Sequence, residues 1–119
     1  MTIPTKILHF NNEDYQDISK IKKKLPGILS LEGKKSKGVI SLGVKAVTVG
    51  TLLSLELNCP HGLIRIKAKG YGTNKLLEGW KPSEGDDIIF ITSLGDQANK
   101  EFKKKLRNFC INQTIKISN

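Results

Sequence analysis

The stretch that decides the fold is Gly85-Asp86-Asp87-Ile88-Ile89-Phe90-Ile91-Thr92, followed by Ser93-Leu94-Gly95-Asp96 and then by Gln97–Cys110. Two acidic residues in a turn precede four consecutive apolar residues, which predict a strand that is central in its sheet or buried on both faces. A tight loop comes next. Beyond it, apolar residues recur every three or four positions, as in an amphipathic helix. This order of turn, strand, loop and helix predicts a domain that mixes α and β structure.

The helix after this loop is expected to begin near Asp96, which would act as its N-cap. Its buried face is predicted to carry four apolar side chains: Ala98, Phe102, Leu106 and Phe109. Its outer face is predicted to be basic and to carry Lys100, Lys103, Lys104 and Arg107. The inner residues therefore serve the core, whereas the outer ones are candidates for function.

The N-terminal part of the chain predicts a strand over 6–10 and a helix over 13–25. Asn12 offers an N-cap to this helix, and two acidic residues follow it directly. Three lysines stand near the opposite end, where the helix dipole favours positive charge. The helix is expected to stop at Pro26-Gly27.

Further short elements are expected along the chain. Segments 28–31 and 63–69 predict strands, and the second alternates apolar and basic residues strictly. Segment 75–80 predicts at most a short helix. The tail at 114–117 also alternates, and it either adds an edge strand or frays.

Segment 42–57 fits two structures. Its apolar residues are compatible with a helix, but β-branched residues and internal glycines weaken that interpretation. We favour a helix or turn over 42–50, followed by a strand or a second helical turn. The choice between helix and strand stays open at this stage.

The composition predicts one domain over 1–119 with an aliphatic core, because 38% of the residues are hydrophobic but only 6% are aromatic. Cys59 and Cys110 are expected to be free thiols rather than a disulfide. No apolar run approaches the length of about 20 residues that a membrane span needs. No secretory signal is visible at the N-terminus, so a cytoplasmic location is expected.

The sequence predicts no catalytic residue, no metal site and no cofactor. Cys59 and His61 are two potential metal ligands, and Cys110 and His9 are two more. A structural zinc site usually draws its four ligands from paired spacings such as Cys-x-x-Cys, which this chain lacks. A catalytic thiol usually meets its histidine from a distant segment, so Cys59 and His61 do not indicate one.

The strongest clue to partners is the net charge of +9, because an excess of Lys and Arg attracts phosphate groups. Three basic clusters are candidates for anion or nucleic-acid binding: Lys34, Lys35 and Lys37; Arg65, Lys67 and Lys69; and Lys100, Lys103, Lys104 and Arg107. Tyr71 and Trp80 are the aromatic residues that are placed to stack on bases.

These observations predict a non-enzymatic basic binding module, which contacts nucleic acid, DNA included, or another polyanion through its Lys and Arg surfaces. A protein partner and a small enzyme with a site assembled from distant residues stay open as alternatives.

The segment Gly85–Thr92, together with Gly95, Asp96, Ala98 and Leu106, resembles the C-terminal part of the HPr phosphocarrier family. That family has a glycine-containing acidic turn, an apolar strand, a glycine-containing loop and a closing helix in the same order.

This resemblance covers residues 27–112 and leaves 1–26 as an N-terminal extension with one strand and one helix. It implies that Leu63–Lys69 with Gly70 forms the second strand and its turn, and that Lys75–Trp80 forms the short middle helix. It further implies an α+β open-faced sandwich, in which a mainly antiparallel sheet of about four strands is packed on one side by two or three helices.

The active loop of the family contains a histidine that accepts the phosphoryl group. The counterparts in this chain are Gly38–Gly43 or Ser41–Ala46, and neither contains a histidine. The resemblance therefore implies, as the alternative function, a regulatory or carrier-related protein that binds protein partners.

Overall fold

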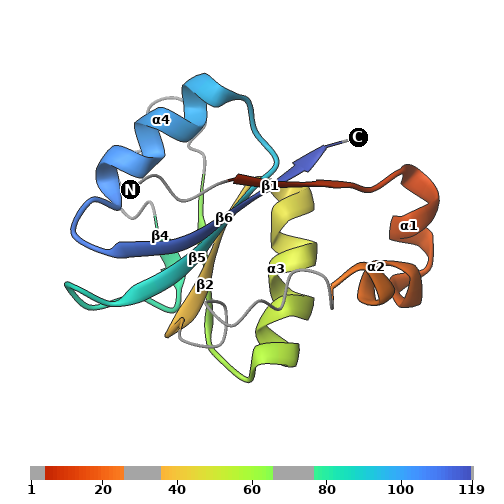
Figure 1. Cartoon of the computed structure of the whole chain (residues 1–119), viewed down its shortest axis with the longest axis horizontal. Helices are drawn as coiled ribbons and strands as arrows, with labels where there is room; N and C mark the ends of the chain where they lie inside the picture. The colour runs from red at the N-terminus through yellow and green to blue at the C-terminus, as the bar shows by residue number, and fades with distance from the viewer. Residues whose placement is uncertain (1–4, 26–35, 66–76, 119) are drawn as a thin grey trace.

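The computed structural model describes residues 5–25, 36–65 and 77–118 of the chain. The strands are β1 (Thr5–His9), β2 (Gly38–Leu42), β3 (His61–Ile64), β4 (Leu77–Gly79), β5 (Asp87–Thr92) and β6 (Cys110–Ser118). The helices are α1 (Asn12–Gln16), α2 (Ile18–Lys24), α3 (Val44–Leu57) and α4 (Asp96–Lys105). Figure 1 shows α3 and α4 on either side of the central strands.

The six strands form one sheet in the order β1-β6-β5-β2-β3-β4. Every neighbouring pair is parallel except β3 with β4. The predicted open-faced sandwich with a four-stranded antiparallel sheet is therefore wrong. Parallel neighbours need long crossover connections, and α3 and α4 supply them between β2 and β3 and between β5 and β6.

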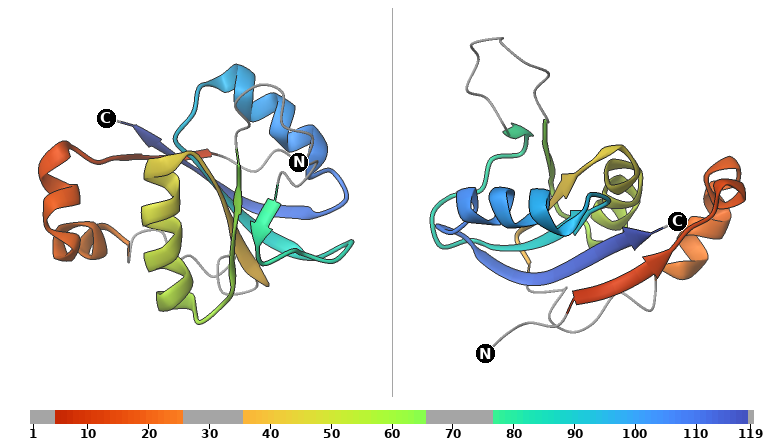
Figure 2. Two further views of the ribbon diagram at one scale, coloured as in Figure 1. Left: turned by 180° about the vertical axis from the view of Figure 1, so that it is seen from behind. Right: turned by 90° about the horizontal axis from the view of Figure 1, so that it is seen from above.

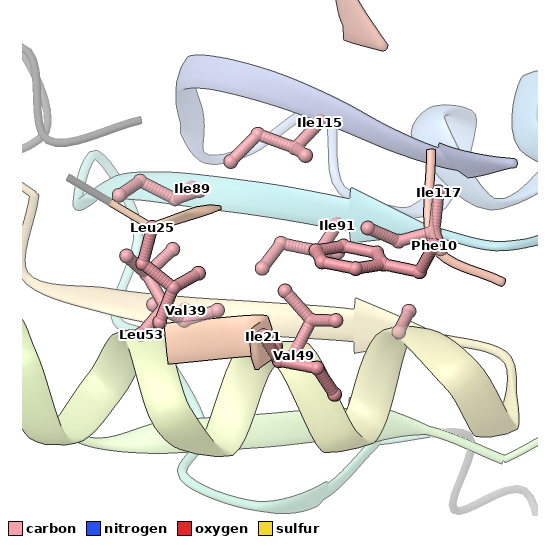
Figure 3. Packing of buried hydrophobic residues seen from close by; sticks show 11 residues of the cluster. Phe10, Ile21, Leu25, Val39, Val49, Leu53, Ile89, Ile91, Ile115 and Ile117 are labelled. Atoms are coloured by element: carbon pink, nitrogen blue, oxygen red, sulfur yellow. The ribbon is translucent and has the colours of Figure 1, made fainter. Parts of the chain in front are cut away.

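The core has two layers, one on each face of the sheet. Figure 2 shows the sheet and its helices from two further directions. On one face, side chains of α2 and α3 pack against alternate residues of β2, β5 and β6, and Figure 3 shows this cluster from Phe10 to Ile117. On the other face, Leu106 and Phe102 from the α4 region pack against Ile40, Leu42 and Phe90. Helices thus cover both faces of the sheet, as in α/β proteins.

The prediction of a buried strand at Ile88–Ile91 is confirmed, because all four of these residues are buried in β5. The helix that follows is also confirmed as α4. It ends at Lys105, so Leu106 and Phe109 lie beyond its last turn, and its N-cap is Gly95 rather than Asp96.

The open choice at 42–57 resolves as one continuous helix, α3. Gly43 turns the chain out of β2 with a φ of 99°, a value that glycine adopts without strain. Asn58 ends the helix in the left-handed conformation, with a φ of 53°. The helical state follows from the parallel pairing of β2 with β3, because the chain must return to the start of the sheet between them.

At the N-terminus the expected strand is confirmed as β1, but the single helix expected over 13–25 is two short helices, α1 and α2. They meet at Asp17, which caps α2 by accepting a hydrogen bond from the backbone N–H of Ser19. The cap of α1 is Asn11 and not Asn12.

Two further expectations change at the C-terminal side. The tail is part of the nine-residue strand β6, which lies between β1 and β5 rather than at an edge. Residues 77–79 form β4 instead of part of a short helix. The expected strand at 28–31 lies outside the described residues, as does the end of the one at 63–69.

Among the described residues, no helix is both long and apolar enough to cross a membrane.

Candidate functional site

The carboxyl ends of β2 and β5 form a switch point in the sheet. The two strands are parallel neighbours, paired from Gly38 with Ile88 to Leu42 with Thr92. The chain leaves β2 through α3 on one face and leaves β5 through α4 on the other. In open α/β sheets, ligands bind outside the carboxyl ends of the strands at such a point.

The loops that leave the two strands touch each other at this edge. The backbone N–H of Ser93 donates to the carbonyl of Leu42 at 3.0 Å, which extends the pairing by one residue. A Cβ on Gly43 would overlap the Ser93 hydroxyl, so only glycine fits between the loops. Neither α3 nor α4 has a side chain that caps its N-terminus. Such helix ends are electropositive and offer backbone N–H groups to anions.

The loop between β5 and α4 is held by three hydrogen bonds. The Thr92 hydroxyl donates to Asn99 Oδ1 at 2.5 Å and accepts from the backbone N–H of Leu94 at 3.1 Å. Asn99 Nδ2 donates to the carbonyl of Leu94 at 3.2 Å. The side chain of Asn99 therefore ties the first turns of α4 to the loop and to the end of β5.

A groove of about 260 Å³ lies beside this loop. It is lined by Thr92, Asp96, Asn99, Lys100, Lys103, Thr114 and Lys116. The first five belong to the end of β5 and to α4, and the last two belong to β6. We call it the carboxyl-edge groove.

The carboxyl-edge groove is basic. Three lysines against one aspartate leave its lining with a net charge of +2. Lys116 Nζ lies 3.2 Å from Asp96 Oδ1, and the aspartate side chain is 84% exposed. The ammonium group of Lys103 lies 5.9 Å from the centre of the Phe90 ring. Several cationic side chains in one groove are suited to hold a phosphate.

The structure brings only part of the predicted basic surface together. Lys100 and Lys103 line the carboxyl-edge groove, whereas Lys104 and Arg107 are exposed outside it. Lys37 precedes β2 and therefore lies at the amino edge of the sheet. Arg65 follows β3 and pairs with Glu78 at 3.2 Å. The other predicted residues, Lys34, Lys35, Lys67, Lys69 and Tyr71, lie outside the described residues.

Packing in the core fixes the position of the Trp80 side chain. A Cβ on Gly38 would overlap its ring, and the ring packs against the buried cluster on the α4 face. Cys59 and Cys110 are both free thiols. The described residues contain no group of three or more His, Cys, Asp and Glu side chains that is arranged for a metal.

The sequence prediction missed five groove residues: Thr92, Asp96, Asn99, Thr114 and Lys116. A signal that could have found Thr92 and Asp96 is their place at or just after the carboxyl end of an apolar strand, whereas Thr114 lies in the middle of β6. That signal has meaning only in a parallel sheet, where these ends share one edge.

Comparison with solved structures shows the class of fold. The chain superposes on a UMP synthase of Leishmania donovani with a TM-score of 0.61 and 19% identity, over 87% of this chain and 22% of that one. It superposes on an orotate phosphoribosyltransferase of Aeropyrum pernix with a TM-score of 0.64 and 18% identity, over 87% of this chain and 60% of that one. The fold is therefore of the phosphoribosyltransferase type. No protein-family model matches the chain, and no curated protein matches its sequence.

These neighbours correct two predictions. The resemblance to HPr phosphocarriers is wrong, because the parallel sheet is that of phosphoribosyltransferases. The prediction of a nucleic-acid-binding module, DNA-binding included, is wrong for the same reason. The HPr resemblance rested on short apolar and glycine patterns, which occur in many folds. The nucleic-acid prediction rested on net charge, which attracts phosphate groups of any kind.

Proposed function

We propose that this protein binds a phosphorylated ribose compound at the carboxyl edge of its sheet, with the phosphate in the carboxyl-edge groove. The observation that carries the proposal is the position of this basic groove, which shares Thr92, Asp96 and Asn99 with the loop at the switch point. The fold neighbours supply the chemical class, because one of them is named for the transfer of a phosphoribosyl group.

The charges of the groove agree with this ligand. A phosphate monoester carries a charge of about −1.5 to −2 at pH 7, and the lining carries +2. Thr92 and Thr114 add neutral side chains to the same lining. The N-termini of α3 and α4, which have no side-chain cap, favour an anion on the same edge of the sheet, and Asp96 in the first turn of α4 partly offsets this.

Calorimetric titration with ribose 5-phosphate tests the proposal, with ribose as the unphosphorylated control. The double variant Lys100→Ala/Lys103→Ala should lower affinity at least about tenfold, because charge-assisted hydrogen bonds are each worth about 1.5–3 kcal/mol. The control is Lys104→Ala/Arg107→Ala, which removes the same charge from exposed positions outside the groove. Equal loss in both variants, or equal binding of ribose, would refute the proposal.

A second candidate is phosphoribosyl transfer to orotate, the reaction in the name of one fold neighbour. In that reaction the bond from ribose C1 to pyrophosphate breaks, pyrophosphate leaves with the electron pair, and a ring nitrogen of orotate bonds to C1 and loses its proton to solvent. Magnesium on substrate phosphates is normally held by one or two carboxylates, and the carboxylate in the groove lining, Asp96, would have to leave its ion pair with Lys116 to serve. Incubation with orotate, phosphoribosyl pyrophosphate and Mg²⁺, monitored by orotate absorbance, tests it. Ribose 5-phosphate binding without turnover would leave the binding function alone.

A further inference from the structure

A second groove, of about 460 Å³, lies at the opposite edge of the sheet. It is formed by the C-terminal part of α3 and the start of β3, and it is lined by Thr51, Ser54, Leu55, Asn58, Cys59, Pro60 and His61. We call it the amino-edge groove. Its volume lies within the range of about 300–1,000 Å³ that is typical of small-molecule sites.

The lining of this groove contains no charged side chain, although 26% of the residues of the chain are charged. The groove also faces the C-terminal end of α3, which is the negative end of the helix dipole. An anion such as a phosphate is therefore disfavoured here. Leu55 and Pro60 add apolar surface beside the polar groups. The groove suits a small neutral molecule.

His61 is held firmly on one side. Its Nε2 lies 2.7 Å from the hydroxyl of Ser41, which is fully buried in β2. Gly50 on α3 leaves room for this pair, because a Cβ there would overlap Ser41 Oγ and lie 2.7 Å from His61 Nε2. The ring therefore has a fixed position, and its other nitrogen faces Thr51 in the groove wall.

The hydrogen bond of Thr51 to Val47 favours one tautomer of His61. The Thr51 hydroxyl donates its hydrogen to the carbonyl of Val47 at 2.8 Å, so Thr51 Oγ1 can only accept from the histidine. We therefore assign the proton of the neutral ring to Nδ1, which points it at Thr51 Oγ1. In the neutral ring, Nε2 is then the acceptor for the Ser41 hydroxyl. Burial lowers the pKa of His61, which favours this neutral form.

The groove consequently presents a donor next to an acceptor. The contact between His61 Nδ1 and Thr51 Oγ1 is long, at 3.5 Å, so the N–H is available for a shorter bond to a ligand. Thr51 Oγ1 keeps a lone pair for a donor from the same ligand. A ligand that matches this donor and acceptor must carry a C=O and an N–H as neighbours along one edge. Cyclic amides carry that edge on a flat ring without charge.

We propose that the amino-edge groove is a ligand site for a small neutral cyclic amide, whose C=O accepts from His61 Nδ1 and whose N–H donates to Thr51 Oγ1. This site is separate from the carboxyl-edge groove and does not depend on the function proposed for it. The apolar surfaces of Leu55 and Pro60 provide contacts for the ring.

The probe for the test is 2-pyridone, a neutral cyclic amide, and its control is N-methyl-2-pyridone, which lacks the N–H. Calorimetry or NMR titration should show binding with a Kd on the order of 1 mM, which is usual for so small a ligand. The N-methyl compound should bind at least about tenfold more weakly. Equal binding of the two compounds, or binding of neither in this range, would overturn the proposal.

The matched variants are Thr51→Val and Thr48→Val. Both replace a threonine on α3, but only Thr51 lines the groove. Thr51→Val keeps the size of the side chain and removes the acceptor, so it should reduce binding of 2-pyridone about tenfold. Thr48→Val should leave it unchanged. A Thr51→Val protein that is folded by circular dichroism and binds with full affinity would rule the site out.

The two free cysteines provide an independent measurement. Cys59 lines the groove and Cys110 is exposed elsewhere. Bound 2-pyridone should slow the alkylation of Cys59 by iodoacetamide and leave Cys110 unaffected. Equal protection of both thiols, or of neither at saturating probe, would contradict binding in this groove.

Discussion

The two grooves lie at opposite edges of the same sheet and differ in charge. The carboxyl-edge groove contains three lysines and an aspartate, whereas the amino-edge groove contains no charged side chain. The helix ends follow the same division, because α3 and α4 begin at the carboxyl edge and α3 ends at the amino edge. A parallel α/β sheet therefore creates one edge for anions and another for neutral or cationic groups.

The largest expected effect is on the amino-edge groove, through Gly50→Ala. The new Cβ would overlap Ser41 Oγ and approach His61 Nε2 within the core. Overpacking of this kind costs about 1–3 kcal/mol, which chemical denaturation measures. Gly95→Ala is the control at the carboxyl edge, because nothing lies within 4 Å of a Cβ there. Equal loss of stability in both variants would show that the Ser41–His61 contact does not constrain Gly50.

The next effect is a pH dependence of stability that comes from His61 in the amino-edge groove. Burial lowers the pKa of His61 in the folded state, so unfolding in acid takes up a proton. The contribution of His61 to the free energy of unfolding should therefore be fully present above the unfolded pKa of about 6.5. It should decrease as pH falls from there through the lower folded pKa.

Denaturant titrations from about pH 8 to about pH 5 measure this dependence. His61→Gln should flatten the curve in that range relative to the wild type. His9→Gln is the comparison at the carboxyl edge, where His9 is exposed and contacts Ser118 at 2.6 Å. A His61→Gln curve that keeps the slope of the wild type would assign the pH dependence to other groups.

A smaller effect concerns the loop at the carboxyl edge. Asn99→Ala removes the bonds to Thr92 and to the carbonyl of Leu94, so the free energy of unfolding should fall by about 1 kcal/mol. Affinity for ribose 5-phosphate should fall as well, because the loop loses its fixed position. Asn108→Ala, at an exposed position after α4, should change neither quantity. Normal stability and normal affinity in Asn99→Ala would remove this loop from the site.

The smallest effect is expected from Asp96→Asn. This change releases Lys116 from its ion pair at the carboxyl-edge groove and raises the charge of the lining from +2 to +3. Exposed ion pairs are worth about 0.2–1 kcal/mol, so affinity for ribose 5-phosphate should rise no more than about fivefold. Calorimetry at two salt concentrations measures this increase, which should shrink at the higher one. A decrease in affinity would mean that Asp96 itself contacts the ligand.

The sequence alone determined the local elements whose patterns are strong. The apolar run of β5 indicates a strand that is buried on both faces. The three-to-four spacing in α4 indicates a helix that is buried on one side. Both elements were predicted correctly. Lys100 and Lys103 were also predicted as anion-binding residues from the polar side of that helix, and this stays a prediction. These properties depend on neighbours within a few residues, so a single chain segment contains the information.

Only the tertiary structure decided the direction of the strands, the state of 42–57 and the composition of both grooves. Short-range periodicity records which side chains are buried but not which strand lies beside another. The HPr resemblance therefore matched the elements and gave the wrong sheet. Ser41, Thr51 and His61 meet only because β2 and β3 are parallel neighbours joined by α3. Thr92 and Lys116 are neighbours for the same kind of reason, since β6 pairs with β5.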